Sequence, residues 1–142
     1  MLKIGVDIHG VAEDCKEFFS EFTRTMVEAG HEVHILSGPP LDVIKSEVHA
    51  LGLSYTHLFS ISEFHKKAGT EMVWDAKGHP FMDDYTWDKT KADYCLREGI
   101  HLHLDDSDAY GYFFKTPYAR FYSKNKREHY VKTSDNDDSG SK

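Results

Sequence analysis

The chain has 142 residues, a formal net charge of −7 and 39% hydrophobic residues. This length suits one domain with one hydrophobic core, and the acidic charge argues against a surface for duplex nucleic acid or for an anionic membrane. The two cysteines, Cys15 and Cys95, lie far apart and in no metal-ligand spacing, so we expect both to be reduced. No stretch approaches the roughly 18 apolar residues of a membrane span, and the first ten residues lack the basic-then-apolar order of a signal peptide. We therefore expect a cytoplasmic protein.

Short apolar strands alternate with helices along most of the chain. Strands are predicted over residues 2–6, 32–36, 57–61, 100–104 and 118–122. Helices are predicted over residues 11–29, 41–51 and 84–98, with a short helix capped by Ser62 and another over 107–114. This alternation predicts an α/β fold, a Rossmann-like three-layer sandwich with a mostly parallel sheet.

Residues 70–83 depart from the alternation and predict a small β-hairpin insertion. We expect one domain over residues 1–130 and a disordered polar tail over 131–142. Helix periodicity places Phe18, Phe19 and Phe22 in the core, and Trp87, Ala92, Cys95 and Leu96 on the inner face of the helix over 84–98. We expect His31 and His34 at the surface or at a rim.

Reactive side chains follow three of the predicted strands. The first strand ends at Asp7, the second at Ser37 and Gly38, and the fourth at Asp105 and Asp106. Because ligands bind beyond the carboxyl ends of parallel strands, we expect these groups to meet at one edge of the sheet. Each residue taken alone also fits a helix cap or a turn, and only their combination favours a site.

Two lysines, Lys89 and Lys91, lie in the first half of the helix that precedes the fourth of these strands. Phosphoryl transfer needs such a set: a carboxylate to attack phosphorus, a divalent cation to screen the repulsion, and ammonium and hydroxyl groups to hold phosphate oxygens. His101 and His103 share one face of the fourth strand and offer an alternative metal pair, although a partly buried polar face is the commoner role for such residues.

Three segments, IGVDIHGV, ILSG and KTKADYCLREGIHLHLDDSDAY, occur in the order of the signatures of the haloacid-dehalogenase superfamily. The chain resembles this superfamily from residue 2 to about residue 122, and its last segment is most similar to the nucleotidase and phosphatase members. The resemblance implies a magnesium-dependent phosphohydrolase that forms an aspartyl-phosphate intermediate. One helix fills most of the segment between Asp7 and Ser37, which leaves no room there for a large cap domain.

The resemblance also implies the roles of individual residues. Asp7 matches the nucleophile and a Mg²⁺ ligand, and Ser37 with Gly38 matches the phosphate-binding hydroxyl and its turn. Lys91 matches the family lysine, with Lys89 as the alternative.

The same comparison of motifs assigns the remaining metal ligands. Asp106 matches the metal-binding carboxylate and Asp105 its acidic neighbour, while the backbone carbonyl of His9 matches a further ligand. Catalytic members usually carry aspartate at the position of His9, where it protonates the leaving oxygen and then activates water. An imidazole can do both, so the leading hypothesis is a phosphatase with His9 among its catalytic residues. The alternative is a catalytically impaired module that binds a phosphorylated ligand or protein.

The predicted hairpin bears on the substrate. It is too small to be more than a flap, so an open site favours a phosphorylated macromolecule, or a small molecule such as a nucleotide that another subunit of a homo-oligomer covers. Four aromatic side chains are candidates to stack on a base, namely Trp74, Phe81, Tyr85 and Trp87. A response-regulator-like phosphoacceptor ranks last, because its acidic pair follows the first strand rather than the fourth.

Overall fold

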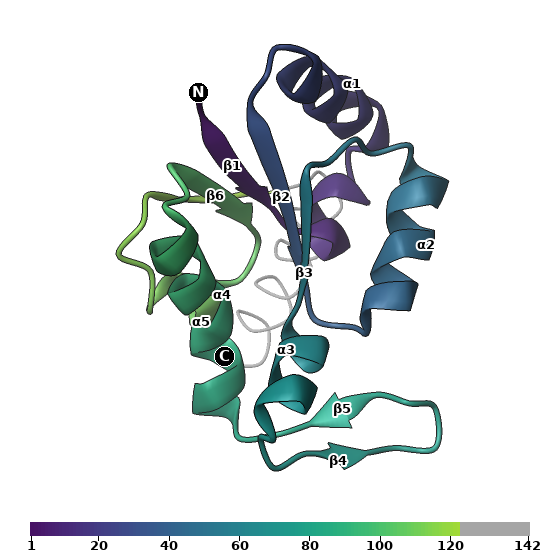
Figure 1. Ribbon diagram of the computed structural model, residues 1–142, viewed down its shortest axis with the longest axis vertical. Coiled ribbons are helices and arrows are strands. Elements are labelled where there is room, and N and C mark those ends of the chain that lie inside the picture. Colours follow the sequence, from purple (N-terminus) through teal and green to yellow (C-terminus); the bar gives the residue numbers. More distant parts are fainter. Residues whose placement is uncertain (123–142) are drawn as a thin grey trace, which may run out of the picture.

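The central layer is a parallel sheet whose strand order places the first strand in the middle. The computed structural model describes residues 1–122, in which five strands form one sheet in the order β3-β2-β1-β6-β7. Their bounds are β1 Lys3–Val6, β2 Glu32–Ser37, β3 His57–Ser60, β6 Leu102–Asp105 and β7 Tyr118–Arg120. Every neighbouring pair is parallel. The chain builds outwards from β1 to β3 on one side and then to β6 and β7 on the other, so the topological switch point lies between β1 and β6 (Figure 1).

Helices cover both faces of this sheet, which confirms the predicted α/β sandwich. The helices are α1 Lys16–Glu28, α2 Leu41–Leu51, α3 Ile61–Ala68, α4 Asp84–Glu98 and α5 Asp108–Gly111. Figure 1 shows α1 and α2 on one side of the strands and α4 with α5 on the other. None of the helices in residues 1–122 is long and apolar enough to cross a membrane.

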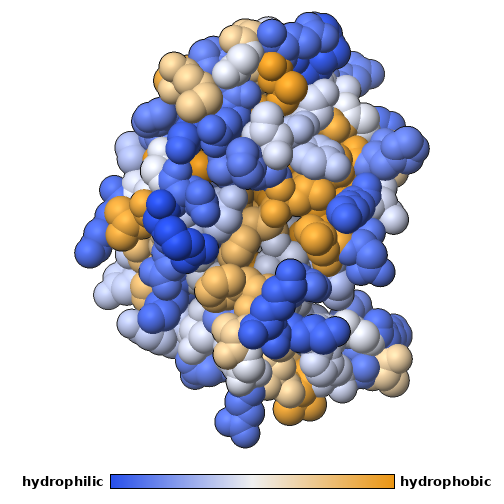
Figure 2. Space-filling view, viewed as in Figure 1, coloured by the Kyte–Doolittle hydropathy of each residue, from blue (hydrophilic) through white to orange (hydrophobic). Residues whose placement is uncertain are grey.

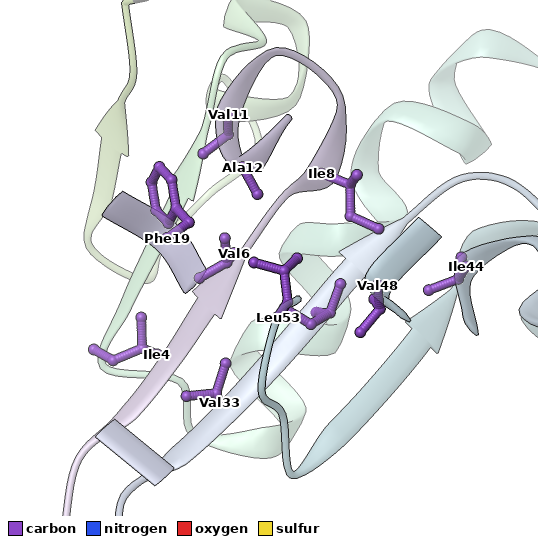
Figure 3. Close-up of a cluster of buried hydrophobic side chains, with 11 residues drawn as sticks. Ile4, Val6, Ile8, Val11, Ala12, Phe19, Val33, Ile44, Val48 and Leu53 are labelled. Carbon is purple, nitrogen blue, oxygen red and sulfur yellow. The ribbon is translucent and has the colours of Figure 1, made fainter. Parts of the chain in front are cut away.

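Alternation along β2 divides its side chains between two cores. Val33 and Ile35 point into the larger core, where they meet side chains of α1 and α2 such as Phe19 and Val48 (Figure 3). Leu36 points the other way, into a second core on the α4 side. Because both faces of β2 are covered, the adjacent residues Ile35 and Leu36 are both buried, one in each core.

Two short strands, β4 (Val73–Trp74) and β5 (Pro80–Phe81), pair antiparallel between α3 and α4. Their turn is fixed by Asp75, whose carboxylate accepts the backbone N–H groups of Lys77 and His79 at 2.9 and 2.8 Å. The pair projects from the sandwich near the carboxyl ends of the strands (Figure 1).

Four local predictions are wrong. Phe18 is 59% exposed, because α1 begins at Lys16 after a wide turn over Ile8–Ala12 and turns Phe19 and Thr23 inwards instead. Leu96 is also 59% exposed, since Cys95 occupies the buried stripe of α4.

The other two corrections concern a histidine and a cap. His34 is buried rather than at the surface, because it lies on the face of β2 that α4 covers and contacts Tyr94 there. Ser60, not Ser62, caps α3 by accepting the Glu63 N–H at 3.0 Å.

Figure 2, drawn from the same side as Figure 1, shows hydrophobic residues gathered near the middle of this face and hydrophilic residues around them. Both cysteines are free, as expected. The predicted domain end at residue 130 and the predicted disorder of residues 131–142 lie outside the described residues.

Candidate functional site

The carboxyl ends of β1, β2 and β6 open into one pocket of about 840 Å³. Asp7, Ser37 and Lys91 lie on its floor, each almost fully buried, and Asp106 lines the same pocket. The Asp7 N–H donates to the Leu104 carbonyl at 3.0 Å, which holds the end of β1 against β6. The pocket therefore opens at the switch point, where parallel sheets bind their ligands.

Lys91 is the buried cation of the site. Its Nζ donates to Asp7 Oδ1 at 2.9 Å and to Asp105 Oδ2 at 2.8 Å. An ammonium carries three N–H donors, so one remains beyond these two carboxylates. Lys89, the alternative lysine, instead places its Nζ 5.1 Å from the centre of the Tyr85 ring.

Asp105 is held by protein groups on both of its oxygens. Oδ2 contacts His103 Nε2 at 2.9 Å in addition to Lys91, while Oδ1 accepts the N–H groups of Asp106 at 2.8 Å and Ser107 at 3.3 Å. The Asp105 side chain is completely buried. These contacts make it an anchor that positions Lys91 and the start of the following loop.

Asp106 faces the pocket and packs against the turn that follows β1. Its carboxylate belongs with those of Asp7 and Asp105 to a group whose ligand atoms all lie within 4.8 Å of one another. Gly10 makes this approach possible: its φ is +81°, and a Cβ there would lie 2.1 Å from Asp106 Oδ2. Only glycine fits both the backbone conformation and the space.

Ser37 is a buried hydroxyl with an unmet hydrogen-bonding capacity. It is 1% exposed, and its Oγ has no hydrogen-bond partner within residues 1–122. Native proteins rarely leave such an atom unpaired. The adjacent Gly38 packs on Trp87, where a Cβ would lie 2.6 Å from the indole ring.

His9 lines the pocket but is directed to its outer wall. Its Nε2 lies 2.7 Å from Glu47 Oε2 on α2, and its side chain is half exposed. The backbone at His9 is extended, with φ −73° and ψ 122°. The imidazole is therefore held by α2, which the sequence did not suggest.

Burial and neighbouring charges have opposing effects on the pKa values of the ionisable side chains at the bottom of the pocket. Burial, together with the neighbouring carboxylates of Asp105 and Asp106, raises the pKa of Asp7 to about 7 against the effect of Lys91. Burial also raises the pKa of Asp105, but the hydrogen bond from His103 and the Lys91 ammonium outweigh it and hold that pKa well below its usual range. Burial lowers the pKa of Lys91, yet the two carboxylates raise it above its ordinary value. The pocket thus keeps Lys91 charged while an anionic Asp7 is costly.

The turn between β4 and β5 forms one rim of the pocket. Lys77, His79 and Pro80 line it from that side. Of the four aromatic residues expected to stack on a base, Trp87 alone lines this pocket, with its indole N–H donating to Tyr110 Oη at 2.8 Å.

Two residues at the site, Glu47 and Tyr110, were not predicted from the sequence, and His103 was predicted as a buried polar or metal-pair residue but not as the partner of Asp105. His103 had a usable signal, since His-Leu-Asp at a strand end puts histidine and aspartate on one face. His101 does not join it in a metal pair; its Nδ1 accepts the Lys3 N–H at 2.9 Å.

Comparison of the chain with protein-family models, with curated proteins and with solved structures gave no match in any of the three.

Proposed function

We propose that the chain is a magnesium-dependent phosphohydrolase of the haloacid-dehalogenase type, with Asp7 as the nucleophile. The observation that carries this proposal is the nearly buried Asp7 carboxylate, paired with Lys91 at 2.9 Å on the floor of a pocket. The same pocket also holds the Ser37 hydroxyl, which has no partner in the described part of the chain. A carboxylate, an ammonium and a hydroxyl around one space match the needs of a transferring phosphoryl group.

The charge of the floor supports a divalent cation. Three carboxylates, those of Asp7, Asp105 and Asp106, face one ammonium, that of Lys91. With all four ionised, the floor would repel a phosphate dianion. The donor set contains only oxygen, which suits Mg²⁺.

The contacts of the three carboxylates separate their roles. Asp105 is fully engaged by protein donors, whereas Asp7, His9 and Asp106 line the pocket. Asp7 and Asp106 with the His9 carbonyl are therefore the groups that would hold Mg²⁺. Bound there, the ion would screen the repulsion between the carboxylates and the phosphate.

The residues of the chain then account for the chemical steps. An Asp7 carboxylate oxygen attacks phosphorus as the bond to the leaving oxygen breaks, which forms an acyl phosphate; water then attacks phosphorus and regenerates the carboxylate. The remaining N–H of Lys91 and the Ser37 hydroxyl donate to phosphate oxygens through both steps. Proton transfer to the leaving oxygen falls to His9, which lines the same pocket.

The test is phosphate release from a panel of nucleotides and generic phosphomonoesters, with and without Mg²⁺. Asp7→Asn should abolish release, and Asp93→Asn, the same change at an exposed position of α4, should leave it unchanged. Release that survives Asp7→Asn would remove Asp7 from the nucleophile role.

The contact between His9 and Glu47 favours a second candidate, a module that binds a phosphorylated ligand without turnover. The imidazole is directed to α2 at 2.7 Å from the glutamate, so it is not held over the floor. Stabilisation by Mg²⁺ with inorganic phosphate, but no phosphate release, would support this candidate. Turnover that first appears in His9→Asp would show that His9 is what prevents catalysis.

A further inference from the structure

A second cluster of metal-binding side chains lies at the opposite end of the sheet from the pocket. Glu32 and His34 lie two residues apart along β2, so both side chains point to the face that α4 covers. His57 is the direct neighbour of His34 on β3. One ligand atom of each residue lies within 4.8 Å of those of the other two. Glu32 is five residues from Ser37 along the strand, or about 16 Å at ~3.3 Å per residue, so this cluster is separate from the acidic floor.

We propose that Glu32, His34 and His57 form a binding site for a divalent transition-metal ion of the Zn²⁺ class, which joins the edge strand β3 to β2. Two imidazoles and one carboxylate suit such an ion better than Mg²⁺, which prefers oxygen ligands. Three protein ligands leave a fourth position for water.

The distances within the cluster fit this ion. Two ligand atoms that each lie 2.0–2.1 Å from a tetrahedral Zn²⁺ are about 3.3 Å apart. Glu32 Oε1 lies 2.8 Å from His34 Nε2 and 3.9 Å from His57 Nδ1, so these two separations differ from that spacing by about half an ångström.

The surroundings of His34 position its ring for coordination. Its Nδ1 lies 2.7 Å from the hydroxyl of Tyr94 on α4. When Nδ1–H donates to that hydroxyl, Nε2 presents its lone pair towards Glu32 and His57. Metal-binding histidines almost always have such a partner on the second nitrogen, because it fixes the tautomer and the ring orientation.

His57 supplies the adjustable ligand. Its ring stacks on that of His34, with centroids 4.1 Å apart and planes 5° apart, so it must turn for both rings to direct a nitrogen at one ion. The His57 side chain is 48% exposed and belongs to an edge strand, so solvent surrounds the space in which it turns. To bind, Nδ1 exchanges its contact with Thr56 Oγ1, at 2.9 Å, for the metal.

The experiment is a Zn²⁺ titration of the whole chain by calorimetry in excess Mg²⁺, which occupies the oxygen-only site. The expected result is one saturable site in the wild type. His57→Ala and Glu32→Gln should each weaken it at least tenfold, and His49→Ala, at an exposed histidine of α2 outside the cluster, should not change it. Tyr94→Phe should weaken binding about 10- to 100-fold at unchanged stoichiometry, as loss of an outer partner does.

Circular dichroism checks that each variant is folded, and Co²⁺ gives a second measurement through the visible absorption of a nitrogen-ligated ion. His57→Ala should keep the phosphate release of the wild type, because the cluster is remote from Asp7. The proposal is overturned if the wild type shows no saturable site, or if His57→Ala and Glu32→Gln bind Zn²⁺ as tightly as the wild type does.

Discussion

Two serines that lie side by side in the sheet allow a direct test of the proposed phosphate site. Ser37 and Ser60 are register neighbours at the ends of β2 and β3, and both are buried. Ser60 Oγ donates to the Pro39 carbonyl at 2.6 Å and accepts the Glu63 N–H at 3.0 Å. Ser37 Oγ has no partner in the described part of the chain. The same change, serine to alanine, should therefore have opposite effects at the two positions.

The magnitudes follow from these contacts. A buried polar group without a partner costs about 1–3 kcal/mol, so Ser37→Ala should leave the free energy of unfolding unchanged or raise it by up to about 2 kcal/mol. Ser60→Ala removes a helix cap and strands the Pro39 carbonyl, and should lower that free energy by about 1–3 kcal/mol. A hydrogen bond to a charged group contributes about 1.5–3 kcal/mol, so Ser37→Ala should also weaken phosphate binding about tenfold or more.

Urea unfolding without Mg²⁺ or phosphate measures the first effect, and the gain in unfolding free energy on adding both measures the second. Ser37→Ala should be at least as stable as the wild type alone and gain less from phosphate. A loss of more than about 1 kcal/mol in ligand-free Ser37→Ala would refute the reasoning, because it would show that the hydroxyl already has a stabilising partner within the protein.

Three further predictions concern the rest of the fold. Lys91→Met leaves two buried carboxylates without their cation and should lower the free energy of unfolding, measured in urea, by about 3–5 kcal/mol. Lys89→Met should change it by no more than about 0.5 kcal/mol. A similar loss in both variants would contradict the buried ion pairs. Gly10→Ala should abolish Mg²⁺-dependent stabilisation, read from thermal unfolding, because the new methyl group takes the space of the Asp106 carboxylate; a full Mg²⁺ response would show that this approach is not needed. Burial lowers the pKa of His65, so the unfolded chain binds more protons than the folded one, and stability falls as pH drops through about 6.5. This fall, measured as the difference between urea midpoints at pH 7.5 and 5.5, should be smaller in His65→Gln. A fall of equal size in the variant would exclude His65 as its source.

The positions of Asp7 and Ser37 followed from the sequence because each ends a strand of a parallel sheet, and a parallel sheet brings such ends to one edge. The choice between Lys89 and Lys91 was open, although the answer was within reach. Trp87, Lys91 and Cys95 are spaced four residues apart and so share one face of α4, while Lys89 lies off it. The buried stripe of the helix therefore selects Lys91.

Other features depend on contacts between distant elements and had no local signal. His34 was expected at the surface because it is polar. It is buried because β2 is covered on both faces, and a polar residue in such a strand needs a hydrogen-bonding neighbour, which is Tyr94 here. The direction of the His9 ring is set by Glu47 on α2, and nothing in the spacing of these two residues relates them.

The acidic pair at the end of β6, Asp105 and Asp106, shows how two identical neighbours acquire different roles. Successive side chains at a strand end point to different sides, so Asp105 turns into the α4 face, where Lys91 and His103 hold it, and Asp106 is left facing the pocket. The anchor keeps Lys91 in place beside Asp7, but it also adds a third carboxylate to a floor with one ammonium. Together with the Ser37 hydroxyl, which has no partner among residues 1–122, this charge leaves the ligand-free pocket less stable than its surroundings. On the proposed function, a divalent cation and a phosphate would together relieve both deficits, so we expect each ligand to bind more tightly in the presence of the other.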